Sequence, residues 1–146
     1  MRRLEVATWS PRSSPGPPPD PERPVIERYG AANVLVAAEG GEVLGSLLLG
    51  PWADLESSRH VLEVKGLAVD PARQGEGIGA ALLDAAIGRS RELGMRRLVL
   101  RVLSGNAGAR HLYESRGFEI EGARREAFLL EGGYVDDLMM GLDLTP

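Results

Sequence analysis

The chain of 146 residues contains no cysteine, which excludes disulfide bonds and thiolate chemistry. Its two histidines, His60 and His111, are too few for a convincing metal site. No apolar run approaches the roughly 18 residues that a membrane span needs, and the N-terminus lacks the apolar core of a signal peptide. We therefore expect a soluble cytoplasmic protein without a metal and without a membrane partner.

The chain also lacks a surplus of basic residues. Its net charge of −4 and its pI near 5.3 argue against a general nucleic-acid-binding protein, which would show a basic face. The length suits a single domain over residues 1–146. Residues 11–24 are crowded with proline, serine and glycine, so we expect irregular structure over residues 1–32, with a short helical turn at 25–29. The ordered core is expected over residues 33–144.

The stretch from residue 62 to residue 94 is the part around which the rest of the chain is organised. An apolar strand is expected over residues 62–69, and Pro71 ends it because proline has no N–H for a sheet. Three glycines follow at alternate positions, directly before a helix-forming run: Gly75, Gly77 and Gly79. Glycines beside the free N–H groups of a first helical turn make a site for phosphate or pyrophosphate.

The helix after this loop is expected to present one apolar face and to end at Gly94. The residues predicted to share that face are Ile78, Leu82, Ala85, Ala86 and Leu93.

Two well-known glycine motifs do not match this loop. A P-loop would need Lys-Ser or Lys-Thr where the chain has Ile78 and Gly79. The dinucleotide fingerprint needs its third glycine one position later and an acidic residue after the next strand, and here that strand is followed by Leu103, Ser104 and Gly105. The glycines alone indicate an anion site without fixing its ligand.

The loop does resemble the acetyl-CoA loop of the GNAT acetyltransferase superfamily, whose pattern is met by Gln74, Gly77 and Gly79. Residues 106–118 resemble the second signature of that family, with an asparagine, an alanine, Leu-Tyr and Gly-Phe at matching intervals. Asn106 is placed to cap a short helix there, and Gly117 to end it. The resemblance covers residues 33–144 and is poor in the first thirty residues.

The resemblance implies an N-acetyltransferase that transfers an acetyl group from acetyl-CoA to a primary amine of a small molecule or peptide, by direct attack in a ternary complex. It also implies that strand backbone binds the pantetheine arm and that the glycine loop binds the pyrophosphate. The implied binding residues are Leu67, Ala68, Val69, Arg73, Gln74, Gly75, Glu76, Gly77, Ile78, Gly79 and Asn106. Glu76 departs from the family pattern, because many relatives carry a basic residue there, and Arg73 is expected to compensate its charge.

Two residues are candidates for proton transfer. Glu63 is the candidate base for the amine, and the alternative is a solvated strand glutamate; Lys65 is expected on the same face, where it can pair with Glu63. Tyr113 is the candidate acid for the leaving thiolate, since the resemblance places it near the thioester sulfur, and the alternative is a buried ring. His111 is expected on the surface.

The remaining sequence completes a mixed α+β prediction. A hairpin is expected over residues 33–50, with both strands central and its turn at Gly40 and Gly41. A strand at 97–102 should run parallel to the strand at 62–69, because a helix joins them. Tail strands are expected at 118–121, 128–130 and 135–144. The predicted fold is a single GNAT-like domain, whose mostly antiparallel sheet of six to seven strands has one parallel pair and helices on both faces.

The last expectations concern Trp52, the charge of the acceptor, the oligomeric state and the alternative functions. Trp52 is interpreted as a core residue rather than a ligand platform. A group of acidic residues near the C-terminus would suit a cationic acceptor, although such groups are usually only solvated: Glu126, Glu131, Asp136 and Asp137. A homodimer and a monomer both stay open, and so do two other classes of function, a non-catalytic acyl-CoA-binding sensor and a structural partner that keeps only the fold.

Overall fold

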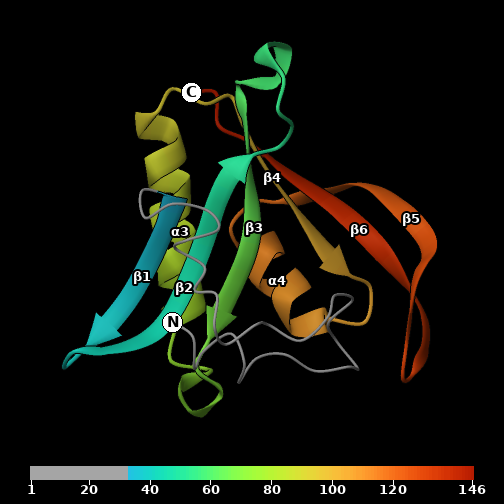
Figure 1. Ribbon diagram of the computed structural model, residues 1–146, viewed down its shortest axis with the longest axis horizontal. Coiled ribbons are helices and arrows are strands. Elements are labelled where there is room, and N and C mark those ends of the chain that lie inside the picture. The colour runs from blue at the N-terminus through green and yellow to red at the C-terminus, as the bar shows by residue number, and fades with distance from the viewer. Residues whose placement is uncertain (1–32) are drawn as a thin grey trace.

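The computed structural model describes residues 33–146, so the predicted irregular stretch and its helical turn lie outside the described residues. The described strands and α-helices are β1 (Val34–Glu39), β2 (Glu42–Pro51), β3 (Val61–Val69), α3 (Ile78–Glu92), β4 (Arg97–Leu103), α4 (Ala107–Ser115), β5 (Glu119–Leu130) and β6 (Gly133–Asp143), and two short 3-10 helices are η2 (Glu56–Ser58) and η3 (Pro71–Arg73). The strands form one sheet in the order β1-β2-β3-β4-β6-β5 (Figure 1). The mixed α+β prediction is confirmed.

The sheet contains one parallel pair, β3 and β4, as predicted from the helix that joins them. Their pairing begins at Val61 and Arg97 and stops at Val64 and Leu100, although both strands continue beyond that point. Figure 1 shows the two strands diverging toward their C-terminal ends, with α4 beside the opening. This divergence positions the candidate site.

A β-bulge in β3 accompanies the divergence. Leu48 of β2 pairs with Gly66, and Leu49 pairs with Val64, so Lys65 is the extra residue between them. A bulge bends its strand and increases the local twist. The bend therefore falls at the residue where β3 leaves β4.

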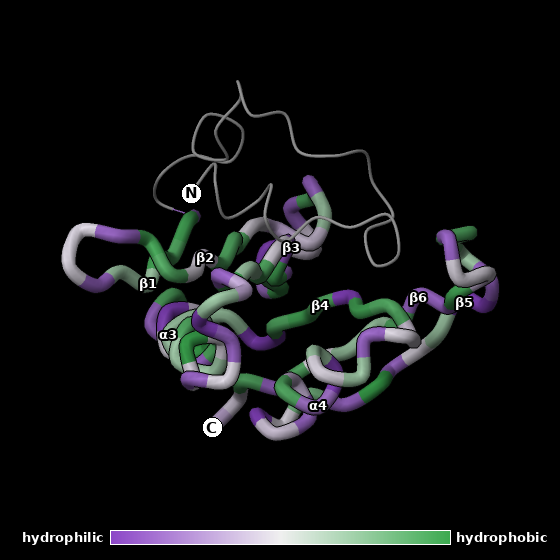
Figure 2. Tube along the Cα trace, turned by 90° about the horizontal axis from the view of Figure 1, so that it is seen from below, coloured by the Kyte–Doolittle hydropathy of each residue, from purple (hydrophilic) through white to green (hydrophobic). Residues whose placement is uncertain are grey.

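Both described α-helices lie on the same side of the sheet (Figure 2), so the described part of the chain does not show the predicted helices on both faces. Helix α3 buries Leu82, Leu83, Ala86 and Ile87 against this side. Two residues of the predicted apolar face, Ala85 and Leu93, are exposed instead. The buried residues recur at positions i, i+1, i+4 and i+5, and this spacing leaves Ala85 and Leu93 outside the buried face.

The N-terminal hairpin turns at Gly40 and Gly41, whose φ angles of 58° and 81° are the left-handed values that the predicted turn requires. Its two strands differ in position. Strand β2 is central, whereas β1 pairs only with β2 among residues 33–146 and leaves half of its residues exposed. The prediction of two central strands is therefore wrong for β1 in the described sheet, since an apolar sequence alone does not tell an edge strand from an inner one.

The tail is one long hairpin. The strands predicted at 118–121 and 128–130 are parts of a single strand, β5, interrupted by a bulge of residues 125–127 opposite Asp136. Glu126 has a φ angle of 50°, and its N–H donates to Asp136 Oδ1 at 2.8 Å. Phe118 precedes β5 and is buried, with its ring edge-on to Tyr113 at a centroid distance of 6.1 Å.

Candidate functional site

The glycine loop between β3 and α3 has the open geometry that its sequence predicts. Gly75 and Gly77 have φ angles of 84° and 82°, and no atom of the described residues lies within 4 Å of a Cβ built on either of them. Helix α3 begins directly after Gly77, which supplies no side chain to cap its first N–H groups. These N–H groups and the positive end of the helix dipole remain available to an anion.

Gly79 has a different role from the other two glycines. A Cβ at this position would lie 3.3 Å from Leu112 Cδ2 and 3.6 Å from Val69 Cγ2. Its missing side chain therefore allows α3, α4 and β3 to pack closely. Only Gly75 and Gly77 of the three are open on their Cβ side.

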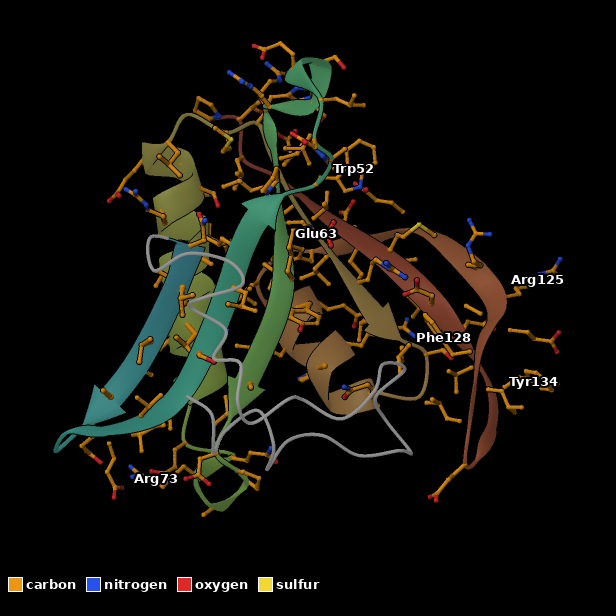
Figure 3. All side chains as sticks on the ribbon, in the orientation of Figure 1. Trp52, Glu63, Arg73, Arg125, Phe128 and Tyr134 are labelled. Carbon is orange, nitrogen blue, oxygen red and sulfur yellow. The ribbon has the colours of Figure 1, made fainter. Side chains whose placement is uncertain are left out.

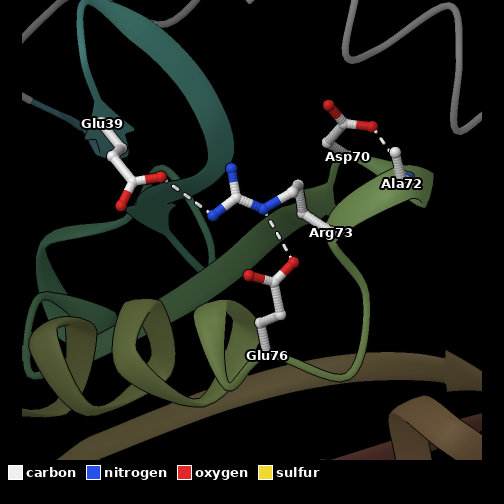
Figure 4. Close-up of polar contacts among 5 residues, drawn as sticks. All are labelled: Glu39, Asp70, Ala72, Arg73 and Glu76. Carbon is white, nitrogen blue, oxygen red and sulfur yellow. Dashed lines mark hydrogen bonds and ion pairs between the residues drawn. The ribbon is translucent and has the colours of Figure 1, made fainter.

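Arg73 binds the carboxylate of Glu76, the loop residue that departs from the family pattern, as Figure 4 shows. Its Nε lies 2.7 Å from Glu76 Oε2 and its Nη2 lies 2.9 Å from Glu39 Oε2. The hydrogen bond to Glu76, followed by that to Glu39, raises the pKa of Arg73 above its ordinary value. The expected compensation of Glu76 by Arg73 is confirmed, and the same arginine ties the loop to the end of β1.

Helix α4 is capped as predicted, because Asn106 Oδ1 accepts the N–H of Ala109 at 3.1 Å. Tyr113 lies on its inner face with 8% of its surface exposed. Burial raises the pKa of the Tyr113 hydroxyl, so this group stays protonated at neutral pH. Within residues 33–146 the hydroxyl makes no hydrogen bond. His111 is exposed, as predicted.

Two cavities follow the path from the glycine loop to the opening between β3 and β4. A cavity of about 560 Å³ extends from Gly75 and Gly77 to Tyr113, and one of about 670 Å³ extends from Tyr113 to Glu63. Four residues line both of them: Leu67, Asn106, Ala109 and Tyr113. Val69, Arg73, Gln74, Ile78 and Gly79 line the first cavity, whereas Ala68 and Glu76 line neither.

A third cavity, of about 510 Å³, is built from side chains on the sheet face opposite the helices. Glu63 lines this cavity and also the one that contains Tyr113. Its side chain is 17% exposed, and its Oε1 lies 4.0 Å from the Nζ of Lys65, which bears out the expected pairing. Figure 3 shows Glu63 where β3 and β4 begin to diverge. Glu63 therefore stands at the junction of the two faces.

Two residues of the third cavity correct sequence predictions. Trp52 was expected in the core, but it is 56% exposed and lines this cavity, because the loop after β2 carries it outward. Asp137 was grouped with solvated acids, yet only 5% of its surface is exposed. Arg101 explains its burial, since Arg101 Nε donates to Asp137 Oδ2 at 2.7 Å. This hydrogen bond raises the pKa of Arg101.

Arg101 was missed by the sequence reasoning. Its signal is a charged residue in the middle of β4, whose other residues after Arg97 at its start are apolar. A cation at such a position requires a partner, and the partner follows 36 residues later in sequence. No periodicity links the two residues, so the pair is visible only once β4 and β6 lie side by side.

Two solved structures resemble this chain over nearly its whole length. The structure of smu.2055 from Streptococcus mutans has a TM-score of 0.88 and 30% identity, and covers 99% of this chain and 91% of that chain. That of yncA from Salmonella typhimurium, solved with its cofactor acetyl-CoA, has a TM-score of 0.85 and 25% identity over 99% of this chain and 87% of that one. The fold of the described residues is thus that of a known class of acetyltransferases.

The chain belongs to the acetyltransferase (GNAT) family, whose pattern it matches over residues 2–118. The match extends to residue 2, beyond the N-terminal limit of the described residues. An L-methionine sulfoximine/L-methionine sulfone acetyltransferase of Pseudomonas aeruginosa is 37% identical over 114 residues, which are 77% of this chain and 66% of that protein. The L-amino acid N-acyltransferase MnaT of Escherichia coli is 32% identical over 76% of this chain and 64% of its own length. The chain spans about two thirds of the length of these relatives.

No helix among residues 33–146 combines the length and the apolar composition that crossing a bilayer demands. No group of three or more His, Asp or Glu side chains within the same range is arranged to hold a metal ion.

Proposed function

We propose that this protein is an N-acetyltransferase that transfers an acetyl group from acetyl-CoA to the primary amine of a small molecule or peptide, in a ternary complex. One observation carries the proposal: Glu63 and Tyr113 line the same cavity at the opening between β3 and β4. One is an acceptor and the other a donor of protons, and acetyl transfer to an amine needs both. The named activities of the relatives support this reaction class.

Acetyl-CoA fits the path of the first two cavities. The open Cβ sides of Gly75 and Gly77 and the uncapped N-terminus of α3 suit its pyrophosphate. The pantetheine arm would lie along Leu67 and Val69, between the diverging strands, and Asn106 would face it from α4. Bound there, acetyl-CoA supplies an activated acetyl group whose carbonyl carbon an amine can attack.

Glu63 is proposed as the base, directly or through one water. An alkyl amine has a pKa of about 10.4, so near pH 7 only about one molecule in 10³ is neutral. As the nitrogen–carbon bond forms and the carbon–sulfur bond breaks, the amine must lose a proton. Glu63 suits this role because its carboxylate reaches both the cavity with Tyr113 and the cavity on the opposite face.

Tyr113 is proposed as the acid that gives a proton to the departing sulfur. A thiol has a pKa of about 8.5, so its thiolate needs only modest help, and we expect a contribution near about 10²-fold. Tyr113→Phe removes the hydroxyl and keeps the ring against Phe118, so it should lower kcat by about that factor. Acetyl-CoA affinity and melting temperature should stay unchanged. Retention of full activity would leave Tyr113 as a core residue.

The raised pKa of Tyr113 gives a second test of its environment. A buried phenol that resists ionisation adds stability below the pKa of the unfolded chain, about 10, and this stability is lost as pH rises toward the folded pKa. Unfolding measured from pH 8 to 11 should therefore show a decline above pH 10 in the wild type that is smaller in Tyr113→Phe.

The alternative function is a non-catalytic acyl-CoA-binding sensor. Release of free thiol from acetyl-CoA, measured with a panel of primary amines, separates the two functions. Turnover with at least one amine supports the enzyme, and tight CoA binding without turnover for any amine supports the sensor. Absence of CoA binding would leave only a structural role for the fold.

We also propose that two copies of the chain associate. Leu129 and Tyr134 form a cross-strand pair near the end of the β5–β6 hairpin, and each is 66% exposed. Strand β5 ends the described sheet, so a second β5 has room to approach it. Light scattering should give the mass of a dimer for the wild type and of a monomer for a double variant with Leu129→Glu and Tyr134→Glu. The cytoplasmic location stays a prediction.

A further inference from the structure

Three arginines among the described residues line the cavity on the sheet face opposite the helices, and only one of them has no partner there. Arg97 forms an ion pair with Glu121, and Arg101 forms one with Asp137. Arg124, on β5, makes neither a hydrogen bond nor an ion pair within residues 33–146. Its charge is therefore available to a ligand in the cavity.

The carboxylate nearest to Arg124 in the strand register does not satisfy it. In the strand register Arg124 lies opposite Asp137 of β6. The side chain of Asp137, however, is buried and accepts hydrogen bonds from Nε and Nη2 of Arg101. The side chain of Asp137 therefore points its charge at β4 rather than at β5. This arrangement keeps Arg124 beside the cavity with an unmet capacity for two parallel hydrogen bonds to an anion.

The negative charge of Glu63 lies at the wall of the cavity farthest from Arg124. Glu63 enters from β3, three strand spacings or about 14 Å across the sheet from β5. Glu63 is in register with Val99 and Arg124 with Leu103, so the two residues are also offset by about 13 Å along the strands, and their backbones lie about 19 Å apart. The strands between the two walls contribute the ion pairs of Arg97 and Arg101 together with apolar side chains, among them Val99 and Met139. The cavity thus has an anionic wall near the reacting centre, a middle of apolar side chains and mutually neutralised ion pairs, and a cationic far wall.

We propose that Arg124 binds an anionic group of the acceptor, so that the acceptor belongs to the class of amino acids or short peptides with a free carboxylate. This inference rests on the proposed acetyltransferase function. The ammonium group of such an acceptor faces Glu63, its apolar part lies on the middle of the cavity, and its carboxylate meets the guanidinium of Arg124. An uncharged or purely cationic amine leaves the cation at the far wall unpaired.

The experiment compares acceptors that differ only in the anionic group. L-leucine, L-leucinamide and isopentylamine share an apolar body, and leucyl-leucine and its amide form a second pair with the carboxylate farther from the amine. Thiol release from acetyl-CoA gives kcat/KM for each acceptor. Calorimetry of the same acceptors with the CoA-saturated protein gives their affinities independently of turnover.

The key variant is Arg124→Gln, which removes the charge and keeps a similar length. We expect it to lower kcat/KM and affinity for the better carboxylated acceptor by about 10- to 100-fold, since a charge-assisted hydrogen bond at this site is lost. Values for the matching amide should change by less than about threefold. The ratio of kcat/KM for the carboxylated acceptor to kcat/KM for its amide is compared between the wild type and Arg124→Gln. This comparison cancels the different intrinsic reactivities of the two amines. Arg124→Lys should restore part of the preference.

Arg125→Gln is the matched control. Arg125 neighbours Arg124 in sequence, does not line this cavity, and in Figure 3 projects outward from the hairpin. It should leave both ratios unchanged. Equal losses for acid and amide in Arg124→Gln, or an unchanged preference, would overturn the inference. Absence of turnover with every amine would refute the proposed function instead, and calorimetry would still decide whether Arg124 recognises the carboxylate.

Discussion

The two ends of the site are built in different ways. The end at the glycine loop is local: its backbone comes from two short segments, each continuous in sequence, and its binding groups are mainly N–H groups and open space. The end on the opposite sheet face gathers side chains from β3, β4, β5, β6 and the loop after β2. The first end leaves a pattern in the sequence, and the second end exists only in the folded sheet.

This difference suggests that the two ends can be altered independently. Glu63, Arg101 and Asp137 line both the cavity with Tyr113 and the cavity on the opposite sheet face, and of these Glu63 is the proposed base. Substitutions at the junction should affect turnover most. Substitutions at either end should affect mainly one ligand.

The largest effect is expected for Glu63→Gln at the junction. If Glu63 takes the amine proton, kcat/KM should fall by about 10²- to 10³-fold at pH 6 to 7 and by less at high pH, where the amine is already neutral. Acetyl-CoA affinity should hardly change. A pH–rate profile that overlays the wild type would show that solvent or another group removes the proton.

A smaller effect, confined to the cofactor end, is expected for Gly77→Val. A valine at a φ angle of 82° costs about 1 to 3 kcal/mol, and its side chain occupies the open space of the loop. We expect the rise in melting temperature on adding CoA to disappear while the domain stays folded. Gly88→Val, in an exposed part of α3, provides a control for the general cost of valine in place of glycine. An undiminished thermal shift in Gly77→Val would place CoA elsewhere.

On the acceptor side of the junction, Asp137→Asn should cost about 1 kcal/mol of stability. It weakens a charge-assisted hydrogen bond to Arg101, whose side chain is 56% exposed and hence partly solvated after the change. Thermal unfolding should show a decrease of about 2 to 4 °C. The acceptor KM should rise while acetyl-CoA affinity is kept. A matching loss of acetyl-CoA affinity would contradict the independence of the two ends.

The smallest effect is expected for Glu76→Gln. This change removes a carboxylate from the anion loop and frees one hydrogen-bonding nitrogen of Arg73, so CoA should bind more tightly, by up to about fivefold. The gain should shrink as salt is added, because both groups are exposed. Equal affinities in titrations at low salt would mean that Arg73 already neutralises Glu76 completely.

The sequence predicted those parts of the molecule whose cause is local. The caps at Asn106 and Gly94, the turn at Gly40 and Gly41 and the loop at Gly77 follow from backbone preferences of single residues, and all have the expected geometry. The parallel pairing of β3 and β4 followed from the helix between them.

The incorrect predictions concern residues whose environment is set by distant parts of the chain. The burial of Asp137 depends on Arg101, and the exposure of Trp52 depends on where the loop after β2 leaves the sheet. The edge position of β1 depends on the order of the strands rather than on its own residues. None of these relations has a period or a spacing that a sequence pattern can show.

The bulge of β5 has a consequence for how this protein can change over evolutionary time. Residues 125–127 lie opposite the single residue Asp136, so the ladder already accommodates surplus chain between the segment ending at Arg124 and the segment starting at Phe128. An insertion or deletion in this bulge would be absorbed locally, with the pairing near β4 kept in register and the tip of the hairpin rotated. The hairpin is thus a natural location for length variation, through which descendants of one ancestral chain can acquire new substrates while the loop at Gly77 stays the same.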